Sequence, residues 1–232
     1  MIHELRTYTA RAGAVPEILK VNEEVGRKAR GNDYGVLEGY WYTEIGPLNQ
    51  VMHLWRYDSY EERTRLRGEL AKVEDWTERY VPTLRPLLVN QTTRFLNPAK
   101  ELVAPAKEGN FYEFRNYRLK PGKVAGWMKR FIDVMPTREK YSRNVCAWIT
   151  EGPNPNEVCH LWAYQSLEER IETRNSVTTE KAWQEFAAAG REELEEMHST
   201  LLFPANFSPT RRASATASRR CCRRLGASAS AP

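Results

Sequence analysis

One eleven-residue stretch occurs twice in this chain, and the duplication constrains the fold more than any other feature of the sequence. Residues 53–63 read His-Leu-Trp-Arg-Tyr-Asp-Ser-Tyr-Glu-Glu-Arg, and residues 160–170 read His-Leu-Trp-Ala-Tyr-Gln-Ser-Leu-Glu-Glu-Arg, at a spacing of 107. The first part of each copy alternates like a half-buried strand. The Ser-x-x-Glu that follows is typical of a helix start, where Ser59 or Ser166 caps free backbone N–H groups. Each copy therefore predicts a strand that leads directly into a helix.

The duplication extends over most of the chain. Residues 2–8 match residues 111–117 at a spacing of 109, so the two copies differ by a two-residue insertion or deletion before the central motif. Trp41, Trp55 and Trp76 recur as Trp148, Trp162 and Trp183, whereas Trp127 has no counterpart. A repeat of about 100 residues is too long for a solenoid unit, so each copy is the size of a domain.

The hydrophobic pattern predicts the same six elements in each copy. We expect a strand over 2–9, a helix over 14–30, a hairpin of 34–44 and 50–57, a helix from Ser59 to about Tyr80, and a strand over about 87–96. This β-α-β-β-α-β order is the ferredoxin-like arrangement, in the α+β class. The second copy should follow the same order, with its second helical region broken near 175–179 and its last strand near 199–207.

These elements predict two domains at 1–97 and 111–207, a linker at 98–110 and a tail at 208–232. The tail is rich in Ser, Ala and Arg, and we expect it to be disordered. Residues 211–232 contain six Arg and no acidic residue, so removing them turns the net charge of +5 into −1. The folded part therefore has no electrostatic footprint for nucleic acid. No apolar run is long enough to span a membrane, and the N-terminus lacks a secretory pattern, which predicts a cytoplasmic protein.

Strand alternation predicts which side chains share a face of the sheet. In the first copy the shared face carries Glu4, Arg6, Tyr8, His53, Trp55 and Tyr57, and in the second it carries Glu113, Arg115, Tyr117, His160, Trp162 and Tyr164. We call these twelve residues the polar–aromatic set. The opposite face carries apolar residues such as Leu5, Met52 and Leu54, which suits the side covered by helices. We therefore expect the polar–aromatic set to be covered by the other copy, or by another chain, packed sheet against sheet.

The two motifs Glu-[Leu/Phe]-Arg-x-Tyr and His-Leu-Trp-x-Tyr-x-Ser, in this order and twice, resemble the NIPSNAP family. The resemblance covers about residues 2–96 and 111–207. It implies a dimeric α/β-barrel arrangement, in which two ferredoxin-like units join their sheets. Relatives in the wider barrel group include cofactor-free oxygenases, isomerases and haem enzymes, so the resemblance implies a fold more than a reaction. Ala163 departs from the first copy, which has Arg56 at this position.

The polar–aromatic set is also the candidate site. Arg6 or Arg115 could anchor an anionic or enolate oxygen, and His53 or His160 could act as a general base, while the aromatic residues wall a pocket. The alternative is structural: Glu and Arg pair inside the barrel and His fixes how the units dock. We expect no metal site and no cofactor, because no His/Cys spacing suits a metal, and a haem bound by a single His is the less favoured alternative.

Two functions from different classes remain open at this stage. One is a small-molecule binding protein or enzyme, such as a cofactor-independent oxygenase or isomerase, with its pocket in the barrel. The other is a non-catalytic scaffold or interaction protein. The oligomeric partner could be the second repeat of the same chain or another copy.

Overall fold

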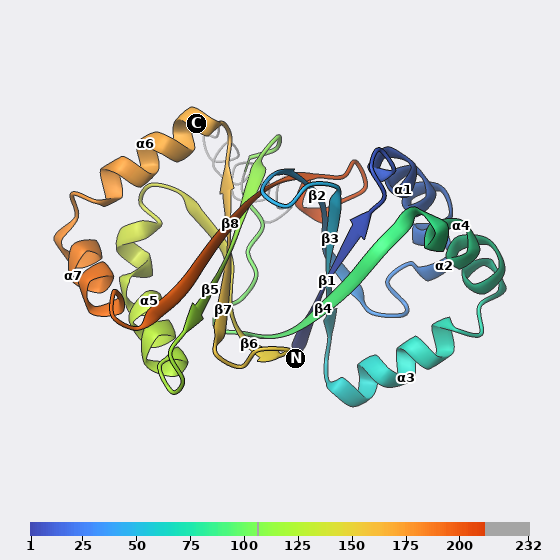
Figure 1. Cartoon of the computed structure of the whole chain (residues 1–232), viewed down its shortest axis with the longest axis horizontal. Helices are drawn as coiled ribbons and strands as arrows, with labels where there is room; N and C mark the ends of the chain where they lie inside the picture. The colour runs from blue at the N-terminus through green and yellow to red at the C-terminus, as the bar shows by residue number, and fades with distance from the viewer. Residues whose placement is uncertain (106, 212–232) are drawn as a thin grey trace, which may run out of the picture.

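The computed structural model describes residues 1–105 and 107–211 and shows a closed barrel of eight strands between two helical layers (Figure 1). The first unit contains β1 (Ile2–Ala10), α1 (Val15–Val21), a π-helical turn (Asn22–Gly26), α2 (Arg27–Arg30), β2 (Val36–Ile45), β3 (Gln50–Tyr57), α3 (Tyr60–Leu70), a second π-helical turn (Asp75–Tyr80), α4 (Val81–Leu84), a 3₁₀ turn (Arg85–Leu87) and β4 (Leu88–Pro98). The second contains β5 (Phe111–Leu119), α5 (Val124–Arg138), β6 (Arg143–Gly152), β7 (Glu157–Tyr164), α6 (Leu167–Val177), α7 (Lys181–Gly190), β8 (Leu194–Pro204) and a 3₁₀ turn (Pro209–Arg211).

The strand-to-helix junction of the repeated motif is confirmed in both units. The Ser59 hydroxyl accepts the backbone N–H of Glu62 at 3.1 Å, and Ser166 accepts that of Glu169 at the same distance. Each glutamate reaches back to the backbone N–H of the residue before its serine, Asp58 or Gln165. The two capping boxes satisfy donors that every helix start leaves free.

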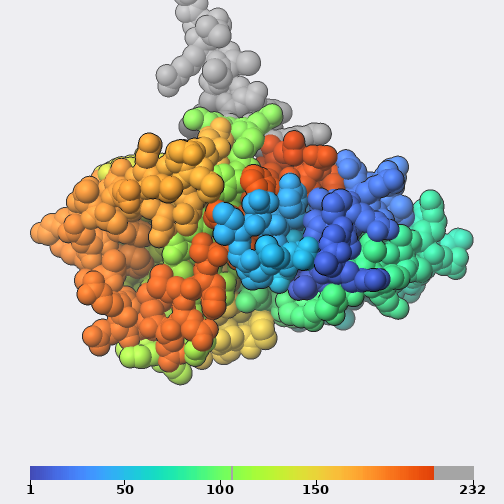
Figure 2. Space-filling view, turned by 45° about the horizontal axis from the view of Figure 1, so that its top comes forward, coloured from blue at the N-terminus to red at the C-terminus, as the bar shows by residue number. Residues whose placement is uncertain are grey.

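The barrel closes within one chain. Its strand order is β1-β3-β2-β8-β5-β7-β6-β4, and the two units join through antiparallel pairing of β2 with β8 and of β4 with β6. Figure 2 shows the meeting of the units as the β2–β3 hairpin lying against the end of the second unit. The predicted intramolecular pairing of the repeats is thus present, although the units join edge to edge and not as stacked sheets.

The prediction for the two sheet faces is wrong. The barrel interior is packed with the apolar face, including Leu5, Met52, Leu54, Phe114 and Leu161. Tyr8, Trp55 and Tyr57 instead belong to the core under the helices of the first unit, and their counterparts lie under the helices of the second. The physical reason is that alternation shows which side chains share a face but not which face the helices cover. Here the helices supply partners for the polar face.

Three boundaries also differ from the sequence prediction. The last strand of the second unit spans Leu194–Pro204, whereas the sequence predicts it near 199–207. The second helical region of the first unit is interrupted after Leu70, as that of the second is after Val177, so the helix does not run unbroken to Tyr80. The expected tail begins too early, because Ser208 and Thr210 are buried and the Tyr112 hydroxyl donates to the Thr210 carbonyl. Residues 212–232 lie outside the described residues. Within the described ranges, no helix is long and apolar enough to cross a membrane.

Candidate functional site

Strand pairing places the charged residues of the repeated motifs next to the histidines. Arg6 on β1 lies opposite His53 on β3, and Arg115 on β5 lies opposite His160 on β7. Glu4 and Glu113 stand opposite Trp55 and Trp162 in the same register. The two strands are neighbours in a ferredoxin-like unit, so this approach follows from the topology.

Each buried glutamate is held by arginines from two elements. Glu113 accepts from Arg170 of α6 at 2.7 and 3.1 Å and from the Ser199 hydroxyl at 2.6 Å, and Arg115 lies 3.4 Å away. Glu4 is bound in the same way by Arg6 at 2.6 Å and by Arg63 of α3 at 2.9 Å. Burial alone would raise the pKa of both carboxyls, but the hydrogen bonds and positive charges of the arginines lower it to about 2. Both are therefore ionised at neutral pH.

The two histidines are fixed as neutral donors. The indole N–H of Trp162 donates to His160 Nδ1 at 2.6 Å, and that of Trp55 donates to His53 Nδ1 at 2.5 Å. Because an indole nitrogen only donates, Nδ1 must be the acceptor, and the neutral ring carries its proton on Nε2. Burial, followed by the charge of the nearby arginine, holds the pKa of both rings well below the usual value. This tautomer presents an N–H at Nε2, so the general-base role considered for His160 does not suit the geometry.

In each unit a buried arginine packs over the tryptophan of the repeated motif. This arginine comes from α2 in the first unit and from α5 in the second. Arg138 lies 4.3 Å from the centre of the Trp162 ring and donates to the hydroxyls of Ser142 and Tyr164. Arg30 lies 3.3 Å from the Trp55 ring and donates to Tyr57. Both residues are only 3% exposed, and burial lowers the pKa of both guanidinium groups. No described carboxylate lies within ion-pair distance of either one.

The helix side of the second unit contains a cavity of about 490 Å³, whereas the corresponding space in the first unit has about 30 Å³. The polar residues of the larger cavity come from both sheet and helices. Aromatic rings form much of its wall: Tyr117, Trp127, Phe131, Trp162, Tyr164, Trp183 and Phe186. A cavity of this size suits a small molecule. The two units therefore share a motif but not an open site.

The difference between the units has a visible cause. In the first unit the Tyr80 side chain fills the space, and its hydroxyl donates to the Asn22 side chain at 2.7 Å. Gly26 makes room for this ring, because a Cβ at that position would come within 2.5 Å of it. The repeat spacing of 107 aligns Tyr80 with Ala187, which lines the open cavity.

A second exchange between the units keeps one aromatic ring packed against each histidine. Tyr40 stacks on His53 in the first unit, whereas Phe131 packs on His160 in the second, where Ala147 takes the strand position of Tyr40. This exchange therefore does not open the cavity.

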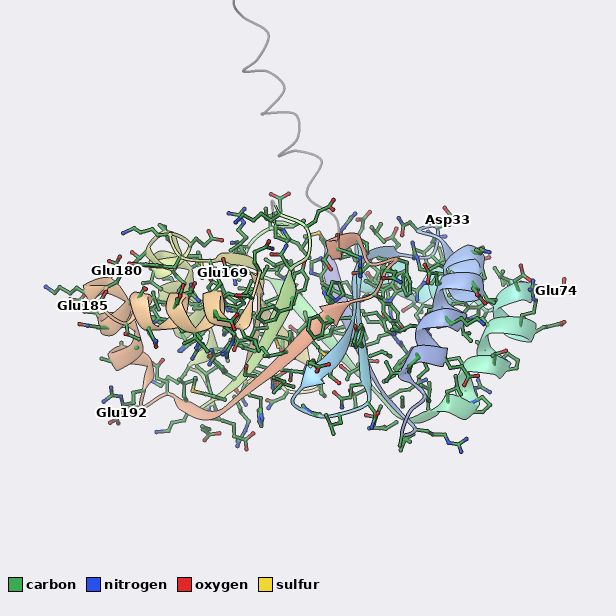
Figure 3. The ribbon with its side chains drawn as sticks, turned by 90° about the horizontal axis from the view of Figure 1, so that it is seen from above. Asp33, Glu74, Glu169, Glu180, Glu185 and Glu192 are labelled. Carbon is green, nitrogen blue, oxygen red and sulfur yellow. The ribbon has the colours of Figure 1, made fainter. Side chains whose placement is uncertain are left out.

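The cavity carries more positive than negative charge. Arg115, Arg138 and Arg174 line it, and the buried carboxylate beside them is Glu113, which Arg170 also binds. Burial, and then the charge of Arg115, lowers the pKa of Arg174. The two acidic residues at the rim, Glu195 and Glu196, pair with Arg118. In Figure 3, Glu169 belongs to α6 and Glu185 to α7, and Glu180 and Glu192 flank α7 on either side.

Other hollows offer less chemistry. The centre of the barrel has only about 10 Å³ of free space. A hollow of about 570 Å³ at one end of the barrel contains none of the polar–aromatic set, and its one arginine, Arg94, is paired with Glu157 at 2.7 Å. No group of three His, Cys, Asp or Glu side chains in the described part of the chain could hold a metal ion. The free cysteines Cys146 and Cys159 are buried in the barrel, where burial raises the pKa of their thiols.

The structure brings the predicted site residues together within each unit, although on the helix side of the sheet. Of the second-unit candidates, Arg115, Tyr117, His160, Trp162 and Tyr164 line the cavity, and Glu113 lies behind Arg115. Tyr8, His53 and Trp55 line the small space of the first unit. Sequence reasoning missed the helical contributions of Arg138, Arg174, Phe131 and Phe186. The available signals were Trp127, which has no counterpart, and the recurrence of Trp76 as Trp183.

Comparison with known proteins agrees with this architecture. The family model for NIPSNAP matches residues 3–101 and 112–209. The chain is 31% identical to human Protein NipSnap homolog 3A over 217 residues, which cover 90% of this chain and 85% of the relative. It is 26% identical to Protein NipSnap homolog of Dictyostelium discoideum over 212 residues, which cover 89% and 88%.

Two solved structures share the fold at low identity. A candidate monooxygenase from Lactobacillus acidophilus has a TM-score of 0.65 at 13% identity and covers 92% of this chain and 97% of its own. An anthrone oxidase-like protein has a TM-score of 0.62 at 12% identity, with 92% and 96% covered. These two show that the arrangement of the barrel and its helices is an established one.

Proposed function

For this chain, which belongs to the NIPSNAP family, we propose that the second unit binds a small molecule with an aromatic or apolar body and an anionic group. The binding site is the cavity between the barrel and the helices α5 and α7. One observation carries the proposal: in the second unit a cavity of about 490 Å³ borders Arg138, a buried cation with no carboxylate partner among the described residues, whereas the space beside the equivalent Arg30 has only about 30 Å³. A buried cation without an ion pair is costly even when neutral groups hydrogen-bond it, and an anionic ligand would lower this cost.

The aromatic wall supports the apolar half of the ligand. Phe186 of α7 packs against Trp127 and Phe131 of α5, with ring centres 5.4 and 5.8 Å away, and Trp183 lines the same cavity. Flat rings in this arrangement offer stacking and edge contacts to a planar guest. Neighbouring guanidinium groups add attraction for a negative charge.

The predicted pocket inside the barrel is thereby replaced by a pocket outside it. The packed barrel centre leaves no room for a guest among Leu54, Phe114 and Leu161. The barrel then serves as the rigid support that fixes Arg115 and His160. A purely non-catalytic scaffold role would give no reason for the cavity to be larger in one unit.

Binding is tested with 1-naphthoate by isothermal titration calorimetry, and the neutral 1-naphthalenemethanol serves as the comparison ligand. Arg115→Met should weaken naphthoate binding by about tenfold or more, the effect of one lost charge-assisted contact. Arg6→Met is the matched control, because Arg6 has the same place in the unit without an open cavity. It should change the affinity less than about twofold.

The histidines provide a second matched pair. His160→Leu should weaken binding, and His53→Leu should not. Equal loss in both units would show that the variants act through folding, and unchanged binding in all four variants would refute the proposal. Circular dichroism of each variant reports whether the barrel has formed.

A further inference from the structure

The chemical class of the ligand can be narrowed from the donors that the cavity wall leaves without partners. Arg115 and His160 are cross-strand neighbours on the same face, and both line the cavity. Within the described residues, Arg115 Nε and His160 Nε2 are buried and have no hydrogen-bond partner. Buried polar groups of native proteins nearly always have partners, so two such groups side by side indicate a missing acceptor.

Both groups donate, and each offers a single N–H. The Trp162 hydrogen bond leaves Nε2 of His160 as the protonated nitrogen. The guanidinium of Arg115 turns its Nη1 toward Glu113 at 3.4 Å, which leaves Nε for another acceptor. Two single donors on adjacent strands suit one oxygen atom better than the two oxygens of a carboxylate, which call for a parallel pair of donors from one guanidinium.

The first unit shows which kind of oxygen the equivalent arginine nitrogen, Nε of Arg6, donates to. There Arg6 Nε donates to the phenolic oxygen of Tyr8 at 2.9 Å. The equivalent phenol of the second unit, Tyr117, lies beside the Arg115 guanidinium and interacts with it, but Nε of Arg115 is left without a partner. The protein thus contains, in its unit without an open cavity, a phenol bound to the equivalent atom.

Building on the function proposed above, we infer that the ligand of the second unit is a phenol or an enol, bound as its oxyanion between Arg115 Nε and His160 Nε2. The four arginines at the wall, Arg115, Arg138, Arg174 and Arg191, favour the ionised form. The proton leaves to solvent, so no side chain has to accept it. Trp162 is a positioning residue: its indole keeps His160 as an Nε2–H donor. His160 then acts as a neutral electrophile toward the oxyanion and not as a base.

The experiment uses 4-nitrophenol, because its phenolate absorbs visible light and its phenol does not. The full-length protein is held in excess, and the absorbance of the bound chromophore is followed against pH. The ionisation midpoint of bound 4-nitrophenol should lie at least one pH unit below that of the free compound, which is a tenfold preference for the phenolate. Arg6→Met should retain this shift and Arg115→Met should lose it.

If Arg115→Met fails to fold, the same ionisation midpoint is measured for His160→Gln and His160→Leu. Glutamine keeps a side-chain N–H and should retain part of the shift, whereas leucine should abolish it. Bound 4-nitrophenol that ionises like the free compound would overturn the inference.

The carboxylate 4-nitrobenzoate separates this failure from failure of the proposed function. If 4-nitrobenzoate binds in the second unit and 4-nitrophenol does not, the anion site stands and the oxyanion inference falls. If neither compound binds, both fall.

Discussion

Replacing Glu113 by glutamine tests whether the buried carboxylate organises the arginines of the second unit. Glu113 is fully buried and is bound by Arg170 and Ser199, with Arg115 beside it. Glutamine has nearly the same shape but no charge. The substitution therefore leaves two guanidinium groups without their counter-charge while the packing is retained.

The size of the effect follows from the lowered pKa. Glu113 has a pKa of about 2 in the folded protein against 4.5 in the unfolded chain, a difference of about 2.5 units. At about 1.4 kcal/mol per unit, ionisation stabilises the fold by about 3 kcal/mol at pH 7. Because the folded pKa is depressed, this contribution is present above pH 4.5 and is lost as the pH falls toward 2. At pH 3 about 2 kcal/mol of it has been lost.

Urea denaturation at pH 7 and pH 3 measures this effect. Glu113→Gln should cost about 3 to 5 kcal/mol at pH 7, as expected when one partner of a buried ion pair is removed. At pH 3 the difference from the wild type should be smaller by about 2 kcal/mol. Glu192→Gln, at an exposed position of the same unit, is the control and should change little at either pH. A cost for Glu113→Gln that is the same at both pH values would refute the reasoning.

Three further changes test other parts of the structure. Ser59→Ala and Ser166→Ala should each lower the free energy of unfolding by about 1 kcal/mol, and unchanged urea midpoints would contradict the observed caps. Ala187→Tyr places in the second unit the side chain that fills the first, so naphthoate binding should fall at least about tenfold with little change in thermal stability; retained affinity would show that Ala187 does not border the bound ligand. Truncation before Thr210 removes the carbonyl that Tyr112 binds and should lower the melting temperature, whereas truncation after Arg211 is the control that keeps it.

The order and topology of the elements could be predicted from the sequence because both copies carry the same motifs. Each copy of the central motif combines a period-2 strand with a capping box, and the ferredoxin-like order then places β1 beside β3. The pairing of Arg115 with His160 followed from these two facts alone. The join of the units into one barrel followed from the family resemblance.

The orientation of the sheet could not be obtained in the same way. Both faces of β7 are fully buried, so its residues give no contrast between an inside and an outside. The polar face contacts helices that carry Arg30 and Arg138. The spacing between these two arginines differs from the spacings between the repeated strand motifs. Part of the two-residue difference between the copies lies at the π-helical turn Asn22–Gly26, which has no counterpart in the continuous helix α5. A one-residue widening of this kind leaves no mark in a hydrophobic pattern.

Closure of the barrel within one polypeptide has a consequence for how such a site can change. When two identical subunits build a barrel, every substitution is made at both halves, and a residue that blocks one pocket blocks the other. In this chain the position of Tyr80 and that of Ala187 are encoded separately. Gene duplication followed by fusion therefore allows one half to specialise in rigidity, while the other remains free to acquire affinity for a guest.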